Sequence, residues 1–154
     1  SLDDRIGAGT IRYAAIDPDA AAIARLRERW PTVSATLGTA EAWAEAAPAG
    51  SVDHVLVLRS WNHLVDPQRV ALAIERALRP GGTLTVVDDV AFGLARSRPH
   101  ARRAEGSRAR FEHYRNDTAR DAARVLDRTA LRCVERRDAG PATSTLWLLR
   151  YQRG

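Results

Sequence analysis

A chain of 154 residues, 45% of them apolar, is long enough to bury the core of one domain. No apolar run reaches the roughly 18 residues of a membrane span and no signal-peptide pattern opens the sequence, which excludes an integral membrane protein and predicts a cytoplasmic location. The formal charge of +5 permits an anionic partner, but every basic residue is arginine, a bias typical of high-GC bacteria.

The first predicted strand ends at a carboxylate. Residues 11–16 are mostly apolar, as in a buried parallel strand, and Asp17 follows them. Pro18 suits the first position of a helix over residues 19–30. Asp17 is therefore expected at the carboxyl edge of a sheet, where open α/β sheets bind ligands, and its oxygens can accept hydrogen bonds from a vicinal diol such as a ribose. The alternative role is a helix cap.

A second strand–helix pair follows. Residues 33–37 predict a short strand, after which Gly38 permits a tight turn and Thr39 can cap a helix over residues 40–47. The Pro-Ala-Gly-Ser stretch at 48–51 then interrupts the chain.

The third unit begins with the clearest strand. Residues 52–58 form a near-continuous apolar run and end in the polar and aromatic cluster Arg59-Ser60-Trp61-Asn62-His63. A helix is predicted from Asp66-Pro67 to about Arg79, closed by Pro80-Gly81-Gly82. A further strand over residues 83–87 ends in Asp88 and Asp89.

The C-terminal part predicts a helix and a hairpin. After a polar, arginine-rich segment at 91–115, a helix is expected to about Thr129, with Asn116-Asp117-Thr118 as its cap. Strands over 131–137 and 144–151 flank a Gly/Pro turn, and Cys133 is expected as a buried thiol. The whole pattern predicts one α/β domain over residues 1–154, with a mostly parallel sheet, a C-terminal antiparallel hairpin, helices on both faces, and 91–115 as a lid or insertion.

Four segments, in this order, resemble the class I S-adenosylmethionine-dependent methyltransferase family, whose sheet is Rossmann-like. They are Ala-Ile-Asp-Pro-Asp around Asp17, Gly38-Thr39-Ala40-Glu41, Val55 to His63, and Leu78-Arg79-Pro80-Gly81-Gly82-Thr83-Leu84. In that family the first bonds the ribose, the second borders the adenine, the third faces the substrate and the fourth is the turn before the fifth strand. The terminal hairpin fits the family as well.

The resemblance implies S-adenosylmethionine as cofactor and assigns roles by position. The cofactor-binding candidates are Asp17, Pro18, Thr39, Ala40, Glu41, Arg59 and Asn62. The catalytic candidates are His63, because imidazole suits a base near neutrality, and Asp88. The substrate-binding candidates are Trp61, His113 and Tyr114. A plain loop histidine and a turn with a helix cap are the alternative roles of His63 and of Asp88-Asp89. No cluster has the spacing of a metal site.

One departure from the family concerns its first strand and glycine-rich loop, which should precede Asp17. Only sixteen residues do so, and residues 1–10, despite Gly7 and Gly9, predict a connecting loop. The chain also contains no methionine. We therefore expect the missing strand to come from an upstream segment or from another chain, since an unpaired strand edge in mid-sheet is costly.

The sequence supports a methyltransferase acting on a small molecule or biosynthetic intermediate, because the chain has no room for a target-recognition domain. The first alternative is a non-catalytic scaffold with the methyltransferase fold. The second is an RNA-binding or RNA-modifying protein that uses the arginines of 96–115, although few aromatic residues accompany them.

Overall fold

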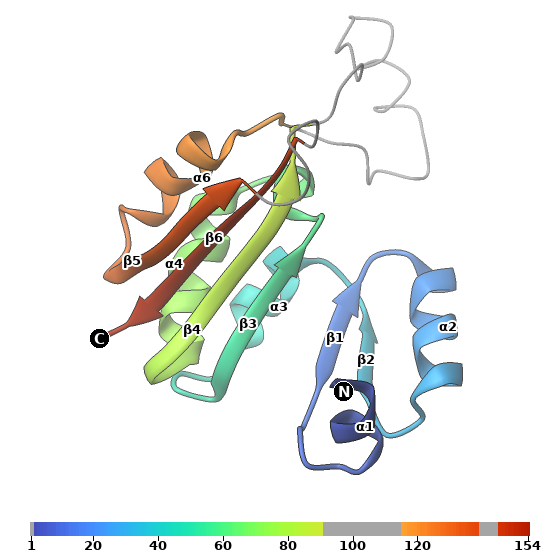
Figure 1. Ribbon diagram of the computed structural model, residues 1–154. Helices are drawn as coiled ribbons and strands as arrows, with labels where there is room; N and C mark the ends of the chain where they lie inside the picture. Colours follow the sequence, from blue (N-terminus) through green and yellow to red (C-terminus); the bar gives the residue numbers. More distant parts are fainter. Residues whose placement is uncertain (1, 91–114, 139–144) are drawn as a thin grey trace, which may run out of the picture. The chain divides into compact units, whose positions relative to one another are not determined.

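The computed structural model describes residues 2–90, 115–138 and 145–154, and divides the chain into two compact units, Ser1–Ala46 and Ala47–Gly154 (Figure 1). Each unit has its own β-sheet. Within these described ranges, no helix is both long and apolar enough to cross a membrane.

The first unit is built around two short parallel strands. Its elements are α1 (Leu2–Gly7), β1 (Ala14–Asp17), α2 (Ala20–Arg29), β2 (Ser34–Leu37) and α3 (Ala40–Ala46). The strands pair from Ala14 opposite Ser34 to Asp17 opposite Leu37, so both end at the same edge. The predicted strands and helices are confirmed here. The loop predicted for residues 1–10 is wrong for 2–7, because α1 gains stability by burying Ile6.

The start of α2 differs from the sequence prediction by one residue. Asp19, with extended backbone angles, is the N-cap, and its carboxylate accepts the backbone N–H of Ala21 at 2.8 Å. Pro18 therefore precedes the helix rather than opening it. Asp19, rather than Asp17, is therefore the N-cap of α2.

In its described residues, the second unit consists of a four-stranded mixed sheet, two α-helices and a short 3₁₀ turn. Its elements are β3 (Val52–Leu58), the 3₁₀ turn η1 (Trp61–His63), α4 (Pro67–Ala77), β4 (Leu78–Asp89), α6 (Ala119–Leu126), β5 (Leu131–Asp138) and β6 (Leu146–Arg153). The strand order is β3-β4-β6-β5, with β3 parallel to β4 and β6 antiparallel to both its neighbours. The predicted hairpin is thus present, and its last strand inserts beside β4.

The core of the second unit lies between the sheet and the pair α4 and α6, which contact each other (Figure 1). The inward side chains of β4, Leu84 and Val86, are fully buried. Both helices start as predicted, since Asp66 caps α4 and Thr118 forms a capping box with Asp121 at α6. These caps fix where each helix begins and hence which loop reaches the sheet edge.

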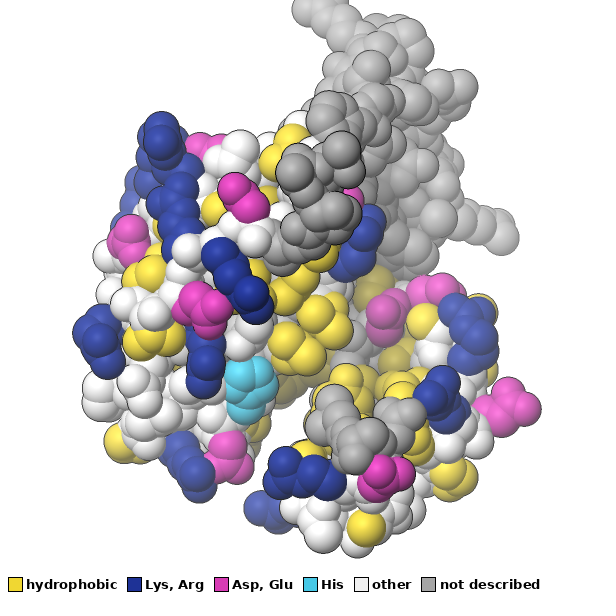
Figure 2. Space-filling view, in the orientation of Figure 1, with side chains coloured by type: hydrophobic (Ala, Val, Ile, Leu, Met, Phe, Trp, Pro, Cys, Tyr) yellow, Lys and Arg dark blue, Asp and Glu magenta, His cyan; other side chains and the backbone are white. Residues whose placement is uncertain are grey.

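β3 lies at the edge of its sheet and is apolar on both sides. Leu56 and Leu58 are 42% and 54% exposed, and Figure 2 shows hydrophobic side chains gathered over β3 and β4. The described strands form two sheets rather than one continuous sheet. The additional strand expected from the sequence stays a prediction.

Cys133 is exposed, so the prediction of a buried thiol is wrong. The reason is that β5 is the other edge strand of the sheet, and Arg132, Cys133 and Val134 are all exposed on it.

Candidate functional site

The carboxyl edge of the first unit places Asp17 beside the turn that follows β2. The backbone N–H of Gly38 donates to the carbonyl oxygen of Asp17 at 3.1 Å, which joins the ends of the two strands. The half-buried Asp17 carboxylate accepts the backbone N–H of Asp19 through Oδ1 at 2.7 Å. Its Oδ2 accepts no hydrogen bond from the part of the chain that the structure describes. One carboxylate oxygen is therefore fixed and the other remains available to a ligand.

The segment after β2 lies at this same edge. Thr39 precedes α3 and its hydroxyl accepts the backbone N–H of Ala42 at 3.2 Å, as its predicted capping role requires. Ala40 and Glu41 form the first turn of α3, and both are half-buried. Within the first unit, the structure thus brings together the four predicted cofactor residues Asp17, Thr39, Ala40 and Glu41.

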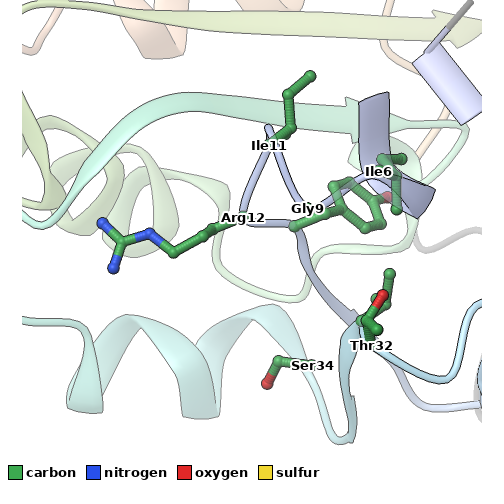
Figure 3. A pocket seen from close by; sticks show the side chains of 8 residues that line it. Ile6, Gly9, Ile11, Arg12, Thr32 and Ser34 are labelled. Atoms are coloured by element: carbon green, nitrogen blue, oxygen red, sulfur yellow. The ribbon is translucent and has the colours of Figure 1, made fainter. Parts of the chain in front are cut away.

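A cavity of about 260 Å³ lies at the opposite end of these two strands (Figure 3). It is lined by Tyr13, just before β1, by Thr32, Val33 and Ser34, at the start of β2, and by Ile6 of α1. Because parallel strands carry their ligands at the carboxyl ends, this cavity is separate from the edge that holds Asp17.

In the second unit, the carboxyl ends of β3 and β4 lie side by side, with Leu58 opposite Val87. Arg59 follows β3 with a φ of 49°, a left-handed conformation that is uncommon outside glycine. Its guanidinium Nη2 lies 3.2 Å from Oδ2 of Asp89. The other oxygen of Asp89, Oδ1, is buried and has no hydrogen-bond partner within residues 2–90, 115–138 and 145–154. Such an orphaned acceptor at a ligand edge is a reason to expect a donor from a bound molecule.

Trp61, Asn62 and Asp88 are fully buried behind this edge. The Asp88 carboxylate accepts the backbone N–H of Asn62 at 3.0 Å and that of Asp89 at 2.8 Å. The Asn62 side chain donates to the carbonyl of Asp89 and accepts the backbone N–H of Asp117. These three side chains are therefore engaged with protein groups and hold the loop after β3 against the end of β4.

His63 is the last residue of η1 and is half-buried. Its backbone N–H donates to Ser60 at 3.1 Å, and Leu64 closes the turn by donating to Trp61 at 3.2 Å. Of the predicted ionisable site residues in this unit, Arg59 is exposed and His63 is half-buried, with its ring Nδ1 buried. His113 and Tyr114 lie outside the described residues, as does all of 91–115 except Arg115.

Sequence reasoning missed Arg115 and Asp117, which contact the loop after β3. Asp117 accepts the indole N–H of Trp61 at 3.1 Å, and Arg115 donates to two carbonyls of that loop. The partners are more than 50 positions apart in sequence, so no local pattern indicated them.

Comparisons with known proteins agree with this geometry. Residues 3–86, more than half of the chain, match a family model described as a methyltransferase domain. An uncharacterized methyltransferase of Mycobacterium tuberculosis is 44% identical over 86 residues, which is 56% of this chain and 34% of that protein. The chain therefore spans about a third of the length of this curated relative.

Two solved structures show the same fold at low identity. The N-methyltransferase NodS of Bradyrhizobium japonicum, in complex with S-adenosyl-L-homocysteine, has a TM-score of 0.62 at 20% identity, over 92% of this chain and 66% of NodS. The cyclase SpnF has a TM-score of 0.66 at 17% identity, over 93% of this chain and 66% of SpnF. The fold is the Rossmann-like fold of class I methyltransferases. By its family match, the chain belongs to the methyltransferase domain family.

Proposed function

We propose that this chain binds S-adenosylmethionine and takes part in methyl transfer to a small molecule or biosynthetic intermediate. The observation that carries the proposal is the Asp17 carboxylate, which stands at the carboxyl end of β1 with one oxygen fixed by Asp19 and the other uncommitted. A carboxylate in this position suits the two hydroxyl groups of a ribose. The residues present therefore fit the nucleoside part of the cofactor.

The residues after β2 complete this part of the proposed site. Thr39, Ala40 and Glu41 follow the turn whose backbone is bonded to Asp17, so we assign them to the border of the adenine. Pro18, which lies between β1 and the cap of α2, limits the backbone freedom beside the carboxylate. In this proposal strand pairing fixes the position of Asp17, and α3 fixes those of Ala40 and Glu41.

The bound cofactor supplies an electrophilic methyl group on a positively charged sulfur. The protein must align the attacking atom of the substrate and, for many substrates, accept its proton. We favour His63 as the base over Asp88, because His63 is half-buried whereas Asp88 is fully buried and accepts two backbone N–H groups. Arg59 and Asp89 are the further candidates for contacting the ligand, since Oδ1 of Asp89 is buried and has no partner among the residues that the structure describes.

Trp61 and Asn62 fit a supporting role better than direct contact with a ligand. Neither exposes surface, and the polar groups of both are hydrogen-bonded to the protein. We therefore assign them to the support of the loop that carries His63.

Isothermal titration calorimetry with S-adenosyl-L-homocysteine tests the proposal on three proteins: the wild type, Asp17→Ala and Asp19→Ala. Asp17→Ala should weaken binding by about 1–3 kcal/mol, because it removes charge-assisted hydrogen bonds to the ribose. Asp19→Ala is the matched control, since it removes a neighbouring carboxylate that caps α2 and should leave the affinity close to that of the wild type. Equal affinity of wild type and Asp17→Ala would contradict the ribose role. If the wild type does not bind, binding by a chain extended upstream would favour the missing-strand expectation, and absence of binding there too would favour the non-catalytic scaffold.

A further inference from the structure

Arg115 and Asp117 are hydrogen-bonded to the loop that carries His63. The guanidinium of Arg115 donates to the carbonyl of Leu64 at 3.2 Å and to that of Trp61 at 3.3 Å. The backbone N–H of Arg115 donates to the carbonyl of Asn62 at 3.2 Å. A single residue therefore holds three carbonyl groups of the turn from 61 to 64, and its guanidinium also lies 6.0 Å from the centre of the Trp61 ring.

Asp117 provides the acceptor at the centre of these contacts. Its Oδ2 accepts the indole N–H of Trp61 at 3.1 Å and Nε of Arg115 at 3.0 Å. Its backbone N–H donates to Oδ1 of Asn62 at 2.8 Å, and its carbonyl accepts the indole N–H of Trp147 at 3.1 Å. The side chains of Arg115 and Asp117 are 24% and 16% exposed, so water screens this ion pair only in part.

η1 has only three residues, and the bonds that close it run from the backbone N–H of His63 to Ser60 and from that of Leu64 to Trp61. The contacts with Arg115 and Asp117 add to these and to the bonds from Asn62 to Asp88 and Asp89. Arg59, just before η1, is held in a left-handed conformation that its side chain does not favour. A short 3₁₀ turn of this kind takes its position from the groups packed against it.

We propose that Asp117, with Arg115, is a positioning residue for His63: the pair fixes the 61–64 turn and thereby the direction in which the imidazole meets the ligand edge. This inference rests on the proposed function, since the position of His63 matters to catalysis only if that edge binds cofactor and substrate. The contacts that carry it lie wholly within the second unit.

The test compares Asp117→Asn with Asp127→Asn. Asp127 is a matched control because it also flanks α6 and also accepts a bond from a buried aromatic side chain, the hydroxyl of Tyr151 at 2.7 Å. Nuclear magnetic resonance on the full chain, labelled on histidine and tryptophan, reports the imidazole signals of His63 and the exchange of the Trp61 indole N–H. Urea unfolding reports the stability of each variant.

Asp117→Asn should shift the His63 signals and speed exchange of the Trp61 indole N–H about tenfold or more, because a neutral amide oxygen in place of the Oδ2 carboxylate oxygen loses the ion pair with Arg115 and makes weaker bonds to both donors. Asp127→Asn should leave both signals unchanged. Unchanged His63 signals in Asp117→Asn, or equal changes in both variants, would overturn the proposal. If Asp117→Asn does not fold, Arg115→Gln serves in its place with the same expected changes.

Calorimetry with S-adenosyl-L-homocysteine on the wild type distinguishes failure of the cofactor-binding proposal from failure of the positioning role of Asp117. If only the cofactor-binding proposal fails, the wild type does not bind, while the His63 signals still respond to Asp117→Asn. Failure of the positioning role would appear as normal binding with His63 signals that do not respond.

Discussion

The buried carboxylate of Asp88 accepts the backbone N–H of Asn62 at 3.0 Å and so joins the end of β4 to the loop after β3. Its other oxygen accepts the backbone N–H of Asp89 at 2.8 Å. Both oxygens of a fully buried carboxylate are thus satisfied by main-chain donors. This bond keeps two chain segments together at the edge where the ligand is proposed to bind.

Asp88→Asn should lower the free energy of unfolding by about 2–3 kcal/mol, because the amide offers one acceptor where two buried donors need one each. Urea unfolding followed by circular dichroism measures the change. Asp138→Asn, at the exposed end of β5, is the control and should change the stability by less than about 0.5 kcal/mol. Unaltered stability of Asp88→Asn combined with lost turnover would instead restore Asp88 as the base.

Gly82→Ala should destabilise the second unit by about 1–3 kcal/mol, because the new methyl group would crowd backbone atoms that cannot move independently. A Cβ at this position would lie 2.8 Å from the carbonyl oxygen of Arg79 and 3.1 Å from that of Asp53. Thermal unfolding measures the effect. Gly7→Ala, in α1 with open space around it, should be neutral or slightly stabilising. If Gly82→Ala is as stable as the wild type, the turn accommodates the added methyl group without loss of stability.

The stability of the protein should fall in mildly acidic solution through His54. Burial, and secondarily the positive charge of Arg150, lower the pKa of His54 below its ordinary value of 6.5, and Nδ1 of the ring lies 2.5 Å from the hydroxyl oxygen of Thr83. Between the folded and unfolded pKa values, the unfolded chain binds more protons on this residue. The free energy of unfolding therefore rises with pH in that window. The contribution of neutral His54 to it is lost as the pH falls from 6.5 through the lower pKa of the folded protein.

His54→Gln removes this titration and keeps a polar side chain. Urea unfolding of wild type and variant between about pH 5 and pH 7.5 should show a steeper loss for the wild type. Parallel pH profiles for the two proteins would assign the acid sensitivity to other groups.

Much of the fold could be predicted because its signals are local. The apolar runs of β3 and β4 and the caps at Asp66 and Thr118 each lie within a few residues of what they determine. The position of Asp17 after an apolar run likewise indicated its place at a strand end. The exact start of a helix is harder to predict when neighbouring residues could each mark it. For this reason Pro18 was predicted to open α2, whereas Asp19 caps it.

The supporting contacts of the site could not be predicted because they depend on distant residues. Trp61 and Asn62 belong to a polar cluster at a strand end, a pattern that indicates ligand contact as readily as burial. Their partners, Arg115 and Asp117, come after an arginine-rich stretch without clear periodicity. Only the folded structure shows that the indole of Trp61 and the amide of Asn62 are hydrogen-bonded to other residues of the chain. Cys133 was misjudged for a related reason, since strand order alone places β5 at an edge.

The side chain of Asn62 touches the main chain on both sides of the stretch from Val90 to Asn116, through the carbonyl of Asp89 and the N–H of Asp117. One side-chain amide thus links two main-chain positions, Asp89 and Asp117, that lie far apart in the sequence, so that a substitution of Asn62 would release both at once.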